Sequence, residues 1–86
     1  MTRRLTEDVL RNLYTAIVKD AGQVGGRMRV KDFYVALSNS LELFFSKDAA
    51  YARLKAERKE EAIWDLAGAA YFLMDQYRII SPPVVT

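Results

Sequence analysis

The sequence predicts an all-α (mainly α) fold, a compact bundle of three to four helices in one domain spanning residues 1–86. Apolar residues recur at helical spacing near the N-terminus and again after residue 32. A third apolar segment, Ala62–Met74, reads AIWDLAGAAYFLM and contains a single polar residue, Asp65. Hydrophobic residues make up 51% of the chain, a rich supply for a protein that buries only about 60–65% of its unfolded surface.

The first predicted helix begins after Thr6, whose hydroxyl can accept from the free amides of the first turn. Glu7 and Asp8 follow where the helix dipole favours anions. Leu5 and Leu10 have the spacing of a hydrophobic staple. The expected apolar face consists of Val9, Leu13, Ala16 and Ile17, with Leu10, Tyr14 and Val18 beside it.

Glycines separate the first two predicted helices. Gly22 is the expected C-cap, and residues 22–26 (GQVGG) are expected to form a turn. The second helix is predicted to begin near Lys31 or Asp32. Its apolar residues at helical spacing are Phe33, Leu37, Leu41 and Phe44. The polar residues 38–40 (SNS) mark either its solvent face or a break.

The third predicted helix runs from about Lys47 to Arg78, with Ser46 as its N-cap. Residues 81–83 (SPP) are expected to stop it, because proline lacks an amide and restricts the preceding residue. No proline lies between the charged residues 53–61 (RLKAERKEE) and the apolar segment Ala62–Met74. Whether residues 47–78 form one helix, or two divided near residues 57–61, stays open. Arg27–Val30 and Arg78–Ile80 are candidates for a minor two-stranded β contact.

Composition excludes several kinds of site. The chain contains no cysteine and no histidine, which rules out disulfides and thiolate zinc sites and removes the usual general base. The apolar segment of thirteen residues is shorter than the roughly 20 needed to span a bilayer. We therefore expect a cytoplasmic protein with no membrane contact and no cofactor.

The segment Ala62–Met74 is apolar around its whole circumference, so we expect it to be enclosed by its own domain or by another chain. One interpretation is a central helix wrapped by the first two helices. The other is a homo-oligomer whose interface contains aromatic residues, which are enriched in such contacts. The expected interface residues are Trp64, Gly68, Tyr71 and Phe72.

Acidic residues recur four apart at Glu57, Glu61 and Asp65, with Glu60 beside them. On one continuous helix the first three would share a face. They form either a solvated face balanced by neighbouring Lys and Arg residues or a divalent-metal site, since Mg²⁺ takes carboxylate oxygens.

The segment Glu60–Ala67, which reads EEAIWDLA, is similar to the acidic helix of the all-α nucleotide pyrophosphohydrolases of the MazG type. The resemblance covers about residues 51–77 and implies acids that hold magnesium for attack on a nucleoside triphosphate. Those families also need a second acidic pair on a preceding helix. Here that helix offers only Asp32 and Glu42, which are not suitably spaced.

Basic residues form a third candidate cluster, consisting of Arg3, Arg4, Arg27, Arg29 and Lys31. Residues 1–31 carry seven Lys/Arg against three Asp/Glu, whereas residues 32–86 carry six against eight. Clusters of this kind contact phosphates. A short strand leading into a helix here would resemble a winged-helix arrangement, although the following helix surface is not basic.

These patterns rank three hypotheses. The first is a non-enzymatic protein-interaction or assembly module that self-associates through its C-terminal apolar helix and could also bind a protein partner. The second is a small nucleic-acid-binding protein that uses the basic cluster. The third is a metal-dependent nucleotide hydrolase with Glu57, Glu60, Glu61 and Asp65 as ligands.

Overall fold

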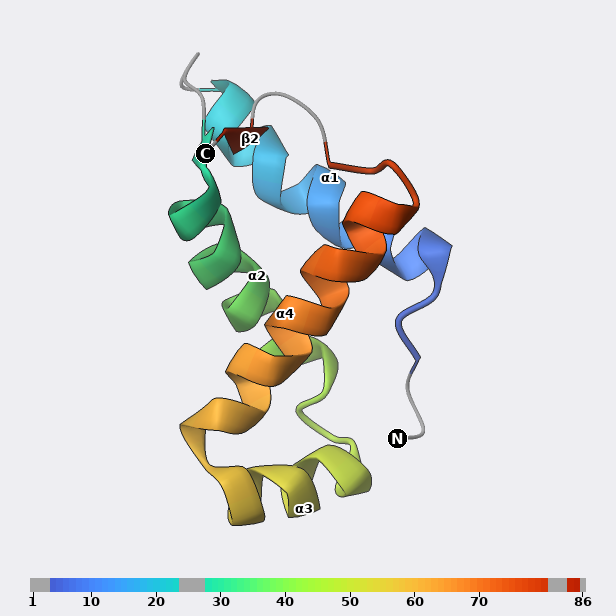
Figure 1. Ribbon diagram of the computed structural model, residues 1–86, viewed down its shortest axis with the longest axis vertical. Helices are drawn as coiled ribbons and strands as arrows, with labels where there is room; N and C mark the ends of the chain where they lie inside the picture. The colour runs from blue at the N-terminus through green and yellow to red at the C-terminus, as the bar shows by residue number, and fades with distance from the viewer. Residues whose placement is uncertain (1–3, 24–27, 81–83, 86) are drawn as a thin grey trace.

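The computed structural model describes residues 4–23, 28–80 and 84–85. Four helices dominate this part of the chain: α1 (Glu7–Gln23), α2 (Val30–Phe44), α3 (Ala49–Arg58) and α4 (Glu60–Gln76). Two short strands, β1 (Met28–Arg29) and β2 (Val84–Val85), pair in parallel. Figure 1 shows α4 running diagonally through the molecule, and α4 packs against each of the other three helices. The predicted mainly α bundle is confirmed, and the short two-stranded contact uses a second strand other than the one predicted.

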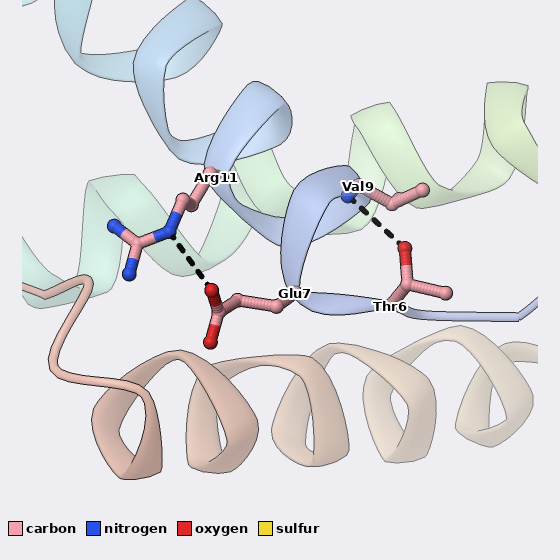
Figure 2. A network of polar contacts seen from close by, with 4 residues as sticks. All are labelled: Thr6, Glu7, Val9 and Arg11. Carbon is pink, nitrogen blue, oxygen red and sulfur yellow. Dashed lines mark hydrogen bonds and ion pairs between the residues drawn. The ribbon is translucent and has the colours of Figure 1, made fainter.

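The N-terminus of α1 forms at the predicted cap. The hydroxyl of Thr6 accepts a hydrogen bond from the amide of Val9 at 3.3 Å, as Figure 2 shows. One turn of helix further on, Arg11 forms an ion pair with Glu7 at 3.4 Å. The cap satisfies one of the amides that lack a partner at the start of a helix.

The buried face of α1 is rotated slightly from the predicted one. Leu10, Tyr14 and Ile17 are buried, whereas Ala16 is exposed. This face buries the larger side chains, and burial of apolar area is what stabilises the packing. The helix also continues to Gln23, one residue past the Gly22 at which we expected it to end.

Helix α2 begins at Val30, slightly earlier than predicted, and runs without a break through the polar residues 38–40. Its predicted apolar residues face the core: Phe33, Leu37 and Leu41 are buried, and Phe44 packs against them. Ser38 is buried rather than solvent-facing. Its hydroxyl donates to the carbonyl of Tyr34 at 2.9 Å, which satisfies the polar group within the helix.

The cap of α3 differs from the prediction. The carboxylate of Asp48 accepts a hydrogen bond from the amide of Tyr51 at 3.0 Å, so Asp48 is the N-cap. The Ser46 hydroxyl instead donates to the carbonyl of Leu43 at 2.8 Å, in the turn that ends α2. The prediction of Ser46 was wrong because the turn after α2 takes up two more residues.

Residues 47–78 form two helices, and the division at Lys59 lies in the predicted region. Lys59 has φ 55° and ψ −127°, a conformation that L-residues rarely adopt. The bend turns α3 across the lower end of α4 in Figure 1. There Tyr51 is buried, with its ring centroid 5.7 Å from that of Phe45. No glycine or proline marks this bend.

The chain after α4 caps the helix instead of forming the predicted strand. Arg78 has φ 57°, its amide donates to the carbonyl of Asp75, and the amide of Ile79 donates to the carbonyl of Met74. This pattern is a Schellman cap, and Ile79 and Met74 are both buried beside it. The expectation that Arg78–Ile80 would form the second strand was therefore wrong.

The second strand is β2, in which Val84 pairs with Met28 and Val85 with Arg29. Residues 81–83, the expected helix stop, lie outside the described residues. The core that the helices enclose has Phe33, Phe45, Leu10, Leu37, Leu41 and Met74 as its largest fully buried side chains. Among the described residues, no helix has both the length and the apolar character that a membrane span requires.

Candidate functional site

The described part of the chain covers only one side of α4, its most apolar helix. The residues of α4 that face the core are Ala62, Ile63, Ala67, Ala70 and Met74. On the other side Trp64 is 44% exposed and Phe72 is 60% exposed. The two lie eight residues apart, about 12 Å along the helix. Enclosure by the chain itself is thus incomplete, and the part left uncovered carries two large aromatic side chains.

Tyr34 of α2 holds the first half of this surface in place. Its hydroxyl donates to the backbone carbonyl of Trp64 at 3.0 Å, and the two rings stack with centroids 5.7 Å apart and an interplanar angle of 12°. Burial raises the pKa of the Tyr34 hydroxyl above its usual 10.0, and the negative charge of Asp65 raises it further. The indole ring of Trp64 is therefore fixed on one face and open to solvent elsewhere.

Gly68 has its packing role within the chain. A Cβ on this residue would lie 2.9 Å from the Tyr34 hydroxyl oxygen, closer than real side chains approach. Tyr71 also packs inward, with its ring centroid 6.0 Å from that of Phe33 in an edge-to-face arrangement. Of the four predicted interface residues, the structure presents Trp64 and Phe72 to solvent, whereas Gly68 and Tyr71 are half-buried and lie against α2.

An open groove of about 750 Å³ lies beside Trp64, between α4 and the beginning of α2. Its lining residues are Arg29, Val30, Lys31, Tyr34, Val35 and Trp64. The walls are almost wholly apolar, and among the described residues the charged ones that line it are Arg29 and Lys31. A groove of this kind suits an apolar side chain that has an acidic neighbour.

The structure joins two candidate sites that the sequence kept apart. Arg29 and Lys31, predicted as part of a basic cluster, line the same groove as Trp64. Both are exposed, and neither forms an ion pair with the described part of the chain. Arg4 is exposed ahead of α1. Arg3 and Arg27 lie outside the described residues.

The predicted acidic stripe is divided by the bend at Lys59, so the expectation that Glu57 would share one helix face with Glu61 and Asp65 was wrong. Arg58 bridges the two helices instead, 2.8 Å from the Asp65 carboxylate and 3.6 Å from that of Glu61. Such exposed pairs contribute only about 0–1 kcal/mol each.

Glu60 is exposed at the first turn of α4. Within residues 4–23, 28–80 and 84–85 there is no group of three or more acidic side chains arranged to hold a metal ion.

The sequence analysis did not identify Val35 as a surface residue of interest. Val35 is 47% exposed and contributes to the groove wall. Its neighbours on that side of α2 are Lys31, Asp32, Asn39 and Glu42. A valine among polar residues, on a helix whose other face already supplies the core, was the signal that could have revealed it.

The function of the chain is inferred from the geometry of the groove and of α4. Comparison of the chain with protein-family models, curated proteins and solved structures found no match.

Proposed function

We propose that this chain is a small non-enzymatic protein-interaction module that self-associates through the uncovered side of α4. The observation that carries the proposal is the exposure of Trp64 and Phe72 on a helix whose opposite side forms the core. Aromatic side chains bury large apolar areas and dominate interface energetics. A second copy of α4 would remove both rings from water.

The rigidity of this surface supports the proposal. Trp64 is held by the stacked ring and the hydrogen bond of Tyr34. An interface residue that is already ordered loses little conformational freedom on binding, so more of the burial energy remains as affinity. The groove next to Trp64 adds a concave apolar surface that a partner side chain can fill.

Multi-angle light scattering over a concentration series from micromolar to hundreds of micromolar tests the proposal. We expect the weight-average mass to rise from near the chain mass of 9.8 kDa toward at least twice that value. A constant mass of one chain across the whole range would contradict self-association.

Binding of single-stranded nucleic acid is the second candidate. Arg29 and Lys31 beside the partly exposed ring of Trp64 favour it, because such sites combine basic residues with aromatic stacking. Anisotropy of a labelled single-stranded oligonucleotide, titrated with the protein at low salt, would show saturable binding that weakens as salt rises. No binding at low salt would exclude this candidate.

A further inference from the structure

Two separate surfaces of the chain have matching chemistry, and the inference drawn from them rests on the proposed self-association. One half is the groove, with Val35 and Trp64 in its apolar walls and Lys31 at its edge. The other half is Phe72, 60% exposed, with Asp75 one turn of α4 further on. An apolar side chain with an acidic neighbour matches an apolar groove with a basic edge.

The charges of the two surfaces are complementary as well. Residues 60–76 of α4 contain four acidic residues and no Lys or Arg. Two of the acidic residues, Glu61 and Asp65, are already paired with Arg58. Asp75 is exposed and has no ion pair among the described residues, as is also true of Lys31. Lys31 at the groove edge and Asp75 beside Phe72 are therefore unpaired charges of opposite sign, although Asp32 is also exposed next to Lys31.

We propose that two copies of the chain form a two-fold symmetric dimer in which Phe72 of each copy fills the Val35–Trp64 groove of the other, with Asp75 beside Lys31. In an isologous dimer each copy presents the same surface. Phe72 and Trp64 are equally far from Gly68 along α4, so the two-fold axis crosses the helix at this level, on the exposed side that carries Ala69. Ala69 is exposed, and its small side chain permits close approach of the second helix.

The two copies of α4 cross at an angle in this dimer. A crossing of about 50°, common for helix packing in globular proteins, separates the helices progressively away from the axis. The crossing keeps Glu61 away from the partner's Asp75, which a parallel alignment of the axes would bring together. In the sense of crossing that tilts the second half of the partner's α4 toward α2, Asp75 comes beside Lys31.

A pair of matched variants tests the contact of Phe72. Phe72→Ala should weaken dimerisation at least about tenfold, as loss of a central aromatic anchor does. The control is Leu43→Ala, because Leu43 is 78% exposed, more than Phe72, and lies nine residues from Tyr34, on the opposite side of α2. Equal effects of the two substitutions on the dimer dissociation constant would overturn the proposal.

Charge reversal tests the second contact independently. Lys31→Glu and Asp75→Lys should each weaken the dimer about tenfold, and the double variant should regain most of the lost affinity. Lys47→Glu, an exposed substitution between α2 and α3, controls for the change in net charge. Failure of the double variant to recover affinity would overturn the assignment of Asp75 to Lys31.

The position of the axis can be tested because the chain has no cysteine. Ala69→Cys should form a disulfide-linked dimer under mild oxidation, whereas Ala52→Cys, exposed on α3, should not. A dimer that Phe72→Ala weakens but that does not cross-link through Ala69→Cys would refute this arrangement and retain the proposed function. A dimer that cross-links only through Ala52→Cys, or that is unaffected by Phe72→Ala, would refute both. A protein that stays monomeric at hundreds of micromolar would refute both.

Discussion

The hydroxyl oxygen of Tyr34 lies 2.9 Å from the point where a side chain on Gly68 would begin. The same hydroxyl donates its hydrogen bond to the carbonyl of Trp64. The missing side chain of one residue therefore allows the polar tip of another to lie against α4. This contact joins α2 to α4 directly beneath the surface proposed to bind a second copy.

This relationship predicts that Gly68→Ala has opposite effects in two backgrounds. In the native chain the added methyl displaces the Tyr34 hydroxyl, and the substitution should lower the free energy of unfolding by about 1 kcal/mol. In the Tyr34→Phe background no hydroxyl is present. There the better helix propensity of alanine should raise the free energy of unfolding by up to about 1 kcal/mol.

Urea denaturation of the four proteins in this double-mutant cycle measures the effect. The same sign and size of change in both backgrounds would show that Tyr34 does not determine the need for glycine at this position.

Lys59 predicts a second change in stability. Its φ of 55° and ψ of −127° are strained for lysine and readily adopted by glycine. Lys59→Gly should raise the free energy of unfolding by about 1 kcal/mol, whereas Lys59→Ala should give no such gain. Chemical denaturation at equal protein concentration distinguishes the two. A stabilising Lys59→Ala would contradict the bend.

The start of α3 predicts unequal effects for two neighbouring polar residues. Asp48→Ala removes the N-cap hydrogen bond from the amide of Tyr51 and should lower the free energy of unfolding by about 1–2 kcal/mol. Ser46→Ala removes only a hydroxyl that donates to a carbonyl in an exposed turn, and should cost less. Melting temperatures of both variants test the order, which would be reversed if Ser46 were the cap.

Tyr51 predicts a loss of stability at high pH. Burial, followed by the neighbouring Glu42 carboxylate, raises its pKa from 10.0 to about 12. The pKa of Tyr51 is higher in the folded chain than in the unfolded one. The protonated hydroxyl therefore makes its full contribution to the free energy of unfolding below about pH 10, and this contribution is lost as pH rises through about 12. Near pH 12 the free energy of unfolding of Tyr51→Phe should therefore have risen by about 2 kcal/mol relative to that of the native chain. Denaturation at a series of pH values measures this difference. Free energies of unfolding that change in parallel with pH in the two proteins would contradict the raised pKa of Tyr51.

Several features could be predicted from sequence because their causes are local. Thr6 caps α1 through an amide three residues away, and the apolar residues of α2 face the core at helical spacing. Local sequence does not determine that Asp48 rather than Ser46 is the N-cap of α3, because both residue types are suitable caps. The position of the cap depends on how far the turn after α2 extends.

Other features depend on contacts between distant parts of the chain. The bend at Lys59 contains no residue that favours a turn, and α3 beyond it packs into the core through Tyr51. Gly68 was correctly associated with close packing, but its partner, Tyr34, lies thirty-four residues earlier in the sequence. The groove combines β1, α2 and α4, so its residue set becomes visible only when the helices are packed.

The fluorescence of Trp64 on dilution tests the central claim most directly, because it is the only tryptophan in the chain and lies on the proposed interface. We predict that its emission shifts to longer wavelength as the protein is diluted and the mass falls to that of one chain, since dissociation exposes the indole ring to water. Emission that stays constant while the mass falls would place the interface elsewhere. A mass of one chain at every concentration would contradict self-association itself.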